Sequence, residues 1–550
     1  MHNISQLLAR KVAEGLGRRA ITKCSDWSRR YRVMGSPYPG PWTFDHHPWT
    51  REMCDSDAEM NIGQKAAQMG FTEVVLNRTF FNMDIRSLDC LYVLPSQRPD
   101  ANDFSSARFA PAIEMSRHLK DLFQDVSNVG HKRAGSCNLY IRGSHARSQL
   151  KSIPVAMIVI DEKDEMTQEN VPLAFERQSG QVTREGWQIS TPTHPGFGIN
   201  ADFDKSSQNH FFFKCPCCSH FIELTYPECL VITAENITDA TLQDSYLQCP
   251  DCKGKLPHED KKSYLSEAKW VESFAGRDWK GWYIPQLYSP TVQPWKIAES
   301  AIKAQSDPFE EQELWNSKIG LPHTVKGAGV TDEEIRSCIG GYRTYTSHHS
   351  TRIVTMGIDV GYPELHIEID EWFLPQQGPV VDVNQLAKCR VLGAFIRSSF
   401  QEASTLLEQF RVNFCVVDAQ PERRLALSFA NEHYGRVRLC SYEQGIGGKA
   451  IHLADDEPRV KVDRTSWLDM SLGRFKSGTI KVPADISEEY KRHIKAQVRT
   501  YEKDRHGNPT GRYITPAGQD HFGHARNYAE IALPLAASYN QPQNIETSVF

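Results

Sequence analysis

The sequence predicts an α/β protein in which a cysteine-rich module separates a region built on a parallel sheet from a second α/β region. From about residue 60 to residue 200, apolar runs of strand length alternate with amphipathic segments. That alternation is typical of a parallel sheet with crossover helices. A second region of the same kind begins near residue 350, and two Cys-x-x-Cys pairs stand between the two regions.

These changes of pattern divide the chain into five expected segments. The first is a polar, aromatic stretch leading into the first α/β core, and the last is a short polar tail. The expected boundaries are 1–204 for the N-terminal segment and first core, 205–265 for the cysteine module, 266–348 for a polar helical linker, 349–540 for the second α/β region and 541–550 for the tail.

The composition is that of an ordinary globular chain, with 40% hydrophobic and 24% charged residues among 550. No apolar stretch approaches the ~20 residues that span a bilayer, and the N-terminus lacks the apolar core of a signal peptide. We therefore expect a cytoplasmic protein without membrane contact. The net charge of −5 gives no overall basic field, so nucleic acid would have to bind local patches such as 491–495 or 423–424.

Residues 65–72 contain a candidate phosphate-binding loop. Such a loop needs small residues whose backbone N–H groups face the phosphates, a lysine for the phosphate charge and a hydroxyl for the metal ion. Gly70 and Thr72 fit this pattern, but Phe71 stands in the usual place of the lysine, and Lys65 lies five residues before Gly70. Taken alone, the segment fits the start of an amphipathic helix better.

The apolar strand that ends at Asp161 and Glu162 changes this balance. A Mg²⁺-ordering aspartate followed by a water-polarising glutamate requires this arrangement. It places both acids at the C-terminal edge of the sheet, where ligands of open α/β sheets bind. Another apolar segment ends in Ser190, Thr191 and Thr193, whose hydroxyls can sense the γ-phosphate and couple hydrolysis to motion. Three elements in this order indicate an ATPase.

These residues carry a resemblance to a known family. The segment Tyr38-Pro-Gly-Pro-Trp42, the loop and the acidic strand end resemble the large terminase subunits of tailed bacteriophages, especially the lambda-type branch, over about residues 35 to 535. The resemblance implies a P-loop ATPase domain whose lysine stands early in its loop. Tyr38 or Trp42 would lie near the adenine, although a surface turn would have the same residues. The other implied ATP-site residues are the phosphate lysine Lys65, the loop residues Gln68 and Gly70, the metal-side hydroxyl of Thr72, the Mg²⁺ partner Asp161 and the catalytic Glu162.

The cysteine module has the spacing of a zinc ribbon. Two Cys-x-x-Cys pairs, separated by thirty residues, offer the four thiolates that tetrahedral Zn²⁺ requires. Cys217 would break the two-residue gap of the first pair, so we leave it outside the site. The expected ligands are Cys215, Cys218, Cys249 and Cys252. A closed site of four cysteines has no free coordination position, so its role is expected to be structural or in binding.

Two strands of the second α/β region also end in acids, Asp359 and Asp418. In a ribonuclease-H-like fold, acids at the ends of neighbouring strands hold two Mg²⁺ ions about 4 Å apart. Either aspartate alone would be read as an ordinary turn residue. Their position after an ATPase region favours a nuclease that uses Mg²⁺ or Mn²⁺.

The third nuclease ligand departs from the family pattern. Terminases often have an aspartate directly before an alanine in a helix, and here His524 occupies that place, with Asp520 about one turn earlier. We expect Asp520 to be the third carboxylate and His524 an auxiliary ligand or base. Glu364, Glu368 and Asp370 alternate beyond Asp359 and are spare carboxylates that could contribute to the same site.

The sequence thus predicts an ATP-driven DNA translocase joined to a metal-dependent endonuclease. The resemblance implies a terminase large subunit that moves double-stranded DNA into a procapsid and cuts concatemers. It also implies partners in the host cytoplasm: a small terminase subunit, a capsid portal and further copies of the chain. The arginine that assists hydrolysis stays open, with Arg98 and Arg142 as candidates. Alternatives are a repair or restriction translocase-nuclease, or a zinc-ribbon DNA-binding scaffold with decayed sites, which Phe71 and His524 favour.

Overall fold

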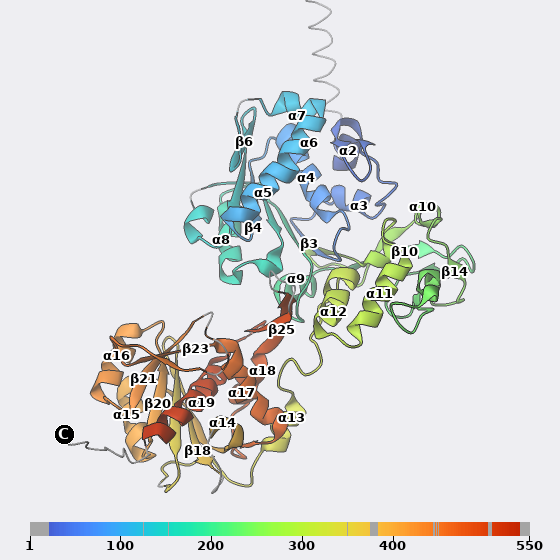
Figure 1. Cartoon of the computed structure of the whole chain (residues 1–550). Helices are drawn as coiled ribbons and strands as arrows, with labels where there is room; N and C mark the ends of the chain where they lie inside the picture. The colour runs from blue at the N-terminus through green and yellow to red at the C-terminus, as the bar shows by residue number, and fades with distance from the viewer. Residues whose placement is uncertain are drawn as a thin grey trace, which may run out of the picture. The chain divides into compact units, whose positions relative to one another are not determined.

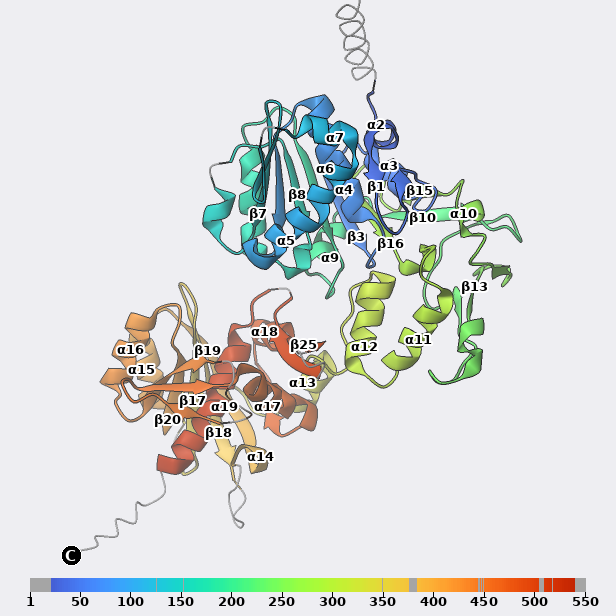
Figure 2. The ribbon, with the colours of Figure 1, turned by 45° about the horizontal axis from the view of Figure 1, so that its top comes forward.

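The computed structural model describes residues 21–124, 126–151, 153–348, 350–374, 383–443, 446, 448, 450–503, 509–516 and 518–539. The chain forms two compact units, Met1–His323 and Thr324–Phe550. Each contains a sheet covered by helices (Figures 1 and 2). The expected tail, 541–550, lies outside the described residues. No helix of the described ranges is long and apolar enough to cross a membrane.

The first unit is built on a sheet whose centre is parallel, as the alternating pattern predicted. Strands β16, β3, β9, β8, β4 and β7 are neighbours in this order, and every adjacent pair is parallel. Antiparallel strands extend the sheet at both edges. In spatial order the strands are β11 (Phe221–Ile222), β10 (Asn209–Lys214), β16 (Trp279–Ile284), β3 (Met60–Lys65), β9 (Glu185–Ser190), β8 (Met157–Asp161), β4 (Cys90–Leu94), β7 (Cys137–Gly143), β6 (His131–Ala134) and β5 (Val126–Asn128), with β15 (Lys269–Glu272) paired to β10.

Helices cover both faces of this sheet because its strands are apolar on both sides. Tyr92 and Val159 pack into the core under α4, whereas Leu91 and Ile158 pack with residues of α8 on the other face. The chain forms separate helices on either side of Ser116, because the backbone of Ser116 is extended. The helices are α2 (Cys24–Tyr31), α3 (Thr50–Cys54), α4 (Phe71–Phe81), α5 (Asn102–Phe104), α6 (Ala110–Met115), α7 (Arg117–Leu122), α8 (Val171–Phe175), α9 (Gly198–Phe203), α10 (Lys261–Tyr264), α11 (Pro294–Ala304) and α12 (Pro308–Glu313).

Two smaller sheets complete the first unit. Strands β1 (Val33–Met34) and β2 (Gly40–Pro41) form a ribbon, and β12 (Leu230–Val231), β13 (Tyr246–Gln248) and β14 (Lys255–Leu256) form a three-stranded sheet. Cys249 and Cys252 lie between β13 and β14, whereas Cys215 and Cys218 lie between β10 and β11 of the main sheet. The segment expected as a helical linker contributes β15 and β16 to the main sheet as well as α11 and α12. Because β16 pairs with all of β3, it supports the strand that ends in Lys65.

The second unit contains a mixed sheet of eight strands among the described residues. The two predicted acidic strands are neighbours: β17 pairs with β20 in parallel and with β18 in antiparallel orientation. The strands, in spatial order, are β22 (His452–Leu453), β23 (Arg459–Val462), β21 (Val437–Tyr442), β20 (Phe414–Asp418), β17 (Val354–Val360), β18 (Leu365–Phe373), β19 (Lys388–Arg397) and β24 (Ile480–Lys481). A separate hairpin joins β25 (Val498–Lys503) to β26 (Pro509–Ile514), and its tip lies outside the described residues. The helices are α13 (Asp332–Cys338), α14 (Val383–Leu386), α15 (Phe400–Gln409), α16 (Arg423–Glu432), α17 (Arg464–Ser477), α18 (Glu488–Ala496) and α19 (His521–Tyr539).

Helix α19 packs against β17, β18 and β20. Gly357 in β17 permits this approach, because a Cβ atom there would lie 2.0 Å from the Ala525 carbonyl oxygen and 2.3 Å from the Ala529 nitrogen. The Thr355 hydroxyl also donates a hydrogen bond of 2.9 Å to the Ala529 carbonyl. The close packing brings the first turn of α19 beside Asp359.

Candidate functional sites

The loop between β3 and α4 contains two residues with a left-handed backbone. Gln68 and Gly70 have left-handed φ values of 62° and 78°. Such a φ is uncommon for a residue with a side chain and is found most often where function demands it. The Ala66 and Ala67 N–H groups donate to the carbonyls of Ile284 and Ser317, so neighbouring segments hold the loop in place.

Lys65 and the two acids of β8 meet beside this loop. Lys65 and Asp161 are buried, and the Lys65 Nζ atom lies 3.6 Å from Glu162 Oε1. Burial and the charge of Glu162 raise the pKa of Asp161 to about 7, while Lys65 opposes the shift. Asp161 Oδ2 accepts a hydrogen bond from the Tyr92 hydroxyl, and its buried Oδ1 has no partner among the described residues. The unpaired carboxylate oxygen is suited to bind a cation, and the lysine beside it is suited to bind an anion.

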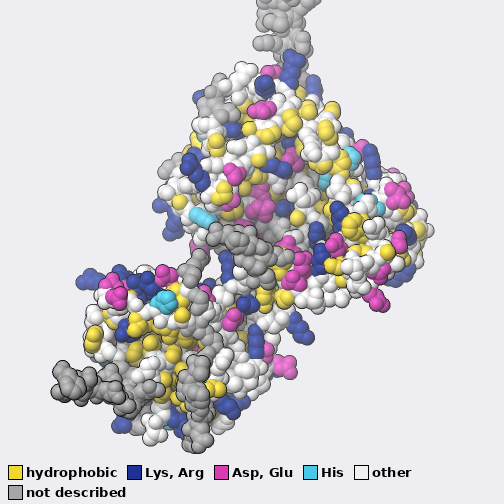
Figure 3. All heavy atoms as spheres, in the orientation of Figure 1, with side chains coloured by type: hydrophobic (Ala, Val, Ile, Leu, Met, Phe, Trp, Pro, Cys, Tyr) yellow, Lys and Arg dark blue, Asp and Glu magenta, His cyan; other side chains and the backbone are white. Residues whose placement is uncertain are grey.

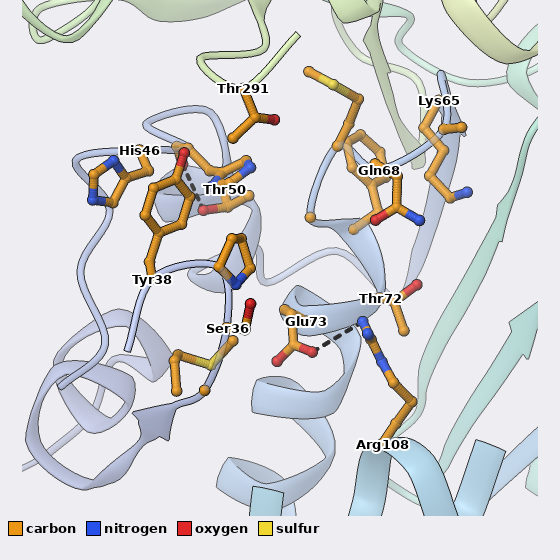
Figure 4. Close-up of a pocket in the computed structure, with 18 of the residues that line it drawn as sticks. Ser36, Tyr38, His46, Thr50, Lys65, Gln68, Thr72, Glu73, Arg108 and Thr291 are labelled. Carbon is orange, nitrogen blue, oxygen red and sulfur yellow. Dashed lines mark hydrogen bonds and ion pairs between the residues drawn. The ribbon is translucent and has the colours of Figure 1, made fainter. Parts of the chain in front are cut away.

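These residues line a cavity of about 460 Å³. Figure 4 shows Lys65, Gln68 and Thr72 at one side of it, with Tyr38 and His46 at the other. Thr191 also lines the cavity, whereas Ser190 and Thr193 do not. All the expected ATP-site residues are thus brought together: Tyr38, Trp42, Lys65, Gln68, Gly70, Thr72, Asp161 and Glu162.

The end of the cavity away from the acids is aromatic. Tyr38 stacks on His46 with ring centroids 3.7 Å apart and planes at 4°. The buried Trp42 has an Nε1 atom without a partner among the described residues. Burial lowers the pKa of His47 to about 4, which keeps that ring neutral at physiological pH. The two histidines had not been predicted, because nothing in the local sequence places them beside Tyr38.

Arg108 is a further lining residue that the sequence did not reveal. It reaches the cavity from the helical segment Ser105–Phe109, and its Nη2 atom lies 3.1 Å from Glu73 Oε1 (Figure 4). Neither expected arginine lines the cavity: Arg98 is exposed, and the Arg142 guanidinium donates to backbone carbonyls of β7 and its neighbouring turn. A contact made only by tertiary packing leaves no pattern in the sequence.

The expected coupling residues connect to the turn that follows Glu162. Ser190 Oγ accepts a hydrogen bond of 3.2 Å from the Asp164 N–H, and the N–H and hydroxyl of Thr193 donate to Asp164 Oδ2 at 2.8 and 2.7 Å. The Thr193 carbonyl accepts in turn from the N–H of His323, the last residue of the first unit. A continuous set of hydrogen bonds therefore runs from the acidic turn to the end of this unit.

The four expected cysteines converge. The sulfur of Cys215 lies 4.0 Å from that of Cys252, and the sulfur of Cys218 lies 3.9 Å from that of Cys249. All four sulfur atoms lie within 4.8 Å of one another. Zn–S bonds of about 2.3 Å in a tetrahedron imply sulfur separations of about 3.8 Å, so the cluster has the size of a Zn²⁺ site. Cys217 is exposed and stands outside the group.

Asp359 and Asp418 lie at equivalent ends of adjacent parallel strands. Burial, followed by the charge of Asp359, raises the pKa of Asp418 to about 6. His521 was not predicted, yet its Nδ1 atom lies 2.8 Å from Asp359 Oδ2, and this hydrogen bond raises the pKa of His521. Two carboxylates that repel each other across neighbouring strands provide the setting in which a divalent ion binds.

Asp520 and His524 contact each other rather than completing a compact metal group. Asp520 directly precedes α19, and its Oδ2 atom lies 3.2 Å from His524 Nε2 and accepts from Thr515 and Gln497. Burial raises the pKa of Asp520, but the hydrogen bonds outweigh this effect and hold the pKa well below its usual range. His524 Nδ1 lies 3.0 Å from the Tyr442 hydroxyl. Within the described ranges, no three of Asp359, Asp418, Asp520 and His524 have ligand atoms that all lie within 4.8 Å.

The spare carboxylates have a different environment. Glu368 and Asp370 are fully buried and ion-paired with Arg526 of α19, and Glu364 is exposed. Glu530 also binds Arg526 and pairs with Arg474 of α17. We therefore correct their interpretation: Glu368 and Asp370 help attach α19 to the sheet.

The basic patches suggested for nucleic acid are interspersed with acids. Lys491 pairs with Glu488, Lys495 with Asp332, and Arg423 with Glu457. On the face drawn in Figure 3, side chains of both signs also stand side by side on each unit. Such pairs reduce the local positive potential, so neither patch stands out as a DNA-binding surface.

The chain also matches known protein families over more than half of its length. Residues 36–270 match the family model of the phage terminase large subunit gpA, ATPase domain, and residues 279–406 match that of the terminase large subunit gpA, endonuclease domain. The chain is similar to the crystal structure of the bacteriophage HK97 large terminase, with 10% identity, 94% of this chain and 99% of that chain covered, and a TM-score of 0.49. It is also similar to the large terminase from a thermophilic bacteriophage, with 10% identity, 90% of this chain and 99% of that chain covered, and a TM-score of 0.32. No curated protein matches the chain.

Proposed function

The chain belongs to the large subunits of phage terminases, with their ATPase and endonuclease domains, and we propose that it moves double-stranded DNA into a procapsid and cuts concatemeric DNA. One observation supports this most directly: the phosphate-loop lysine, the hydroxyl and both acids line one cavity. In this proposal a small terminase subunit, a capsid portal and further copies of the chain are the partners, and the host cytoplasm is the site of action.

In the ATP site, Lys65 would neutralise charge on the β- and γ-phosphates, while loop N–H groups other than those of Ala66 and Ala67 bind their oxygens. The Thr72 hydroxyl and Asp161 would hold Mg²⁺, which supplies charge neutralisation during phosphoryl transfer. The unpaired Oδ1 of Asp161 supports this assignment. Glu162, 43% exposed and 3.6 Å from Lys65, would orient the attacking water. Tyr38 and Trp42 would enclose the adenine.

Hydrolysis would be transmitted through the turn after Glu162. Asp164 accepts both hydrogen bonds from Thr193, so a shift of this turn on loss of the γ-phosphate would move the end of β9. The His323 N–H binds the Thr193 carbonyl, so the same movement would reach the end of the ATPase unit. Ser190, Thr191 and Thr193 are the proposed coupling residues.

In the nuclease unit, Asp359 and Asp418 would hold Mg²⁺ or Mn²⁺, which activates water and stabilises the leaving oxygen. Asp520 and His524 are the proposed additional ligands or bases. His521 would orient Asp359 through their hydrogen bond.

In the first unit, Zn²⁺ would bind Cys215, Cys218, Cys249 and Cys252 and link the strands of the cysteine module.

Hydrolysis of ATP in the presence of DNA tests the motor. Glu162→Ala should abolish turnover, whereas Glu169→Ala, at an exposed position of the same unit, should keep it. No turnover in the wild type, or full turnover in Glu162→Ala, would favour the scaffold alternative.

Metal-dependent cutting of a plasmid tests the nuclease. Compared with the wild type, Asp359→Ala should lose this cutting and keep ATPase activity. The exposed Asp456→Ala serves as its control.

A further inference from the structure

Three side chains that belong to neither proposed active site gather between β18 and α18. They are His366 of β18 and Glu489 and His493 of α18, the last two one helical turn apart on the same face. Their ligand atoms all lie within 4.8 Å of one another. Nε2 of His366 lies 4.0 Å from Glu489 Oε1, and Nε2 of His493 lies 3.9 Å from the same oxygen.

Three of the four ring nitrogens in this cluster lack partners among the described residues. His366 is 4% exposed, and neither of its nitrogens forms a hydrogen bond within the described part of the chain. His493 is fully buried, and its Nε2 is likewise without one. The separations from Glu489 exceed hydrogen-bond range. A buried unpaired nitrogen costs stability, and one cation between the three side chains would bind one such nitrogen of each imidazole ring.

We propose that His366, Glu489 and His493 form a metal site for a late first-row divalent ion such as Zn²⁺ or Co²⁺. Imidazole nitrogen suits these ions, whereas Mg²⁺ prefers oxygen ligands. Three protein ligands leave a coordination position for water. Glu489, 35% exposed, provides a path from solvent to the buried histidines.

The other contact of His493 is compatible with this site. The Phe522 N–H points to His493 Nδ1 over 3.5 Å, at the limit of hydrogen bonding. Metal binding at Nε2 places the ring proton on Nδ1, so this contact is lost. Because a contact of 3.5 Å is weak, losing it costs less than the stabilisation from an ion that binds one nitrogen of each ring.

A bound ion would also fix the surroundings of Asp359. The ring of His366 stacks on that of His521 with centroids 4.5 Å apart and planes at 21°, and His521 binds Asp359. His366 is thus a positioning residue for the imidazole beside the proposed nuclease acid. Only this consequence depends on the proposed nuclease function; the metal site itself does not.

The test is the zinc content of the full chain, purified with Zn²⁺ and freed of loosely bound metal. Glu489→Gln keeps the shape of the partly exposed side chain and removes one ligand. The wild type should retain one more zinc ion per chain than this variant. The affinity of the variant for zinc at this site should fall by about tenfold or more. His433→Gln is the matched control, because His433 lies in the same unit and binds Ser404 at 2.8 Å. It should keep the wild-type content.

The wild type, Glu489→Gln and His433→Gln all keep the cysteine cluster, so zinc bound there does not change the difference in their zinc content. Equal zinc content in the wild type and Glu489→Gln would overturn the proposal. Substitution with Co²⁺ gives a second readout: the difference spectrum should show d–d bands without sulfur-to-metal charge transfer. A difference dominated by charge transfer would place the lost ion at the cysteines and would also overturn it.

Discussion

Lys65 and Glu162 face each other in the nucleotide cavity, with Nζ 3.6 Å from Oε1, although β9 lies between the strands that end beside them. In the proposed ATP site, this relationship lets Lys65 take the role of the lysine that is missing after Gly70. Phe71, which occupies that place, is buried in the core. Lys65 instead reaches the two acids from the start of the loop, because it is the last residue of β3.

Lys65→Ala should therefore reduce kcat/KM for ATP by roughly 10²–10³-fold, the effect of removing one preorganised charge at a transition state. Loss of the ammonium also removes the group that opposes the raised pKa of Asp161, so the variant should bind Mg²⁺-nucleotide less tightly near neutral pH. Steady-state hydrolysis and nucleotide titration measure both effects. Lys296→Ala, at a residue outside the cavity, is the control; equal activity of the two variants would contradict the assignment.

The sequence was informative where the chemistry is local. The apolar strands that end at Asp161, Asp359 and Asp418 could be recognised because each run has strand length and ends in an acid. Contacts set by tertiary packing could not be recognised. Arg108 reaches Glu73 only because the helical segment Ser105–Phe109 borders the cavity.

The same limit explains the nuclease site. His521 meets Asp359 because Gly357 lets α19 approach the sheet, and the sequence contains no periodic signal for that approach. The spare carboxylates were misread for a related reason. Glu368 and Asp370 alternate along a strand like ligands, but their partner, Arg526, is distant in the sequence.

Gly357→Ala tests whether this close packing builds the nuclease site. The added Cβ would lie 2.0 Å from a backbone oxygen of α19, so the helix must move, at a cost of roughly 1–3 kcal/mol. Plasmid cutting should fall while ATP hydrolysis is kept. Gly473→Ala is the matched control, because it lies within α17 with no atom within 4 Å of the added Cβ, and it should stabilise the unit by about 0.5–1 kcal/mol. Unchanged unfolding and cutting in Gly357→Ala would contradict this role.

The pKa of Asp418 predicts a pH dependence of metal use. Because metal binds the ionised carboxylate, protons compete with it below about pH 6, and half-saturation by Mn²⁺ should require more metal as the pH falls. In the metal-free protein the sign for stability follows the same shift. A pKa raised on folding means that the folded state holds the proton more tightly, so stability falls as pH rises from about 4 to about 6. Mn²⁺ titrations of plasmid cutting between about pH 5 and about pH 8 measure the first effect. A constant half-saturation would exclude Asp418 as a ligand.

Arg526 attaches α19 to the sheet through buried ion pairs. Its guanidinium binds Glu368, Asp370 and Glu530, all fully buried. Glu530 keeps its pair with Arg474, but Arg526→Met would leave Glu368 and Asp370 without their cation, which typically costs about 3–5 kcal/mol. Denaturant unfolding of the second unit should shift accordingly. Arg436→Met, which breaks a solvent-exposed pair with Glu408, should shift it much less. Similar losses in both variants would show that the buried cluster has no special role.

The cysteine module gives a prediction in which neighbouring residues differ. Cys218 lies 3.9 Å from Cys249 within the four-sulfur cluster, whereas Cys217 is exposed and outside it. Cys218→Ser should therefore lower the zinc content by one ion per chain, and Cys217→Ser should leave it unchanged. Removing the ion also removes the link between the strands of the module, because a structural Zn²⁺ contributes folding energy directly. Cys218→Ser should accordingly be cleaved faster by protease within residues 215–252, while the parallel sheet of the ATPase unit stays resistant. Zinc loss in Cys217→Ser instead would exchange the roles of the two cysteines and require the first pair to bind with a one-residue gap.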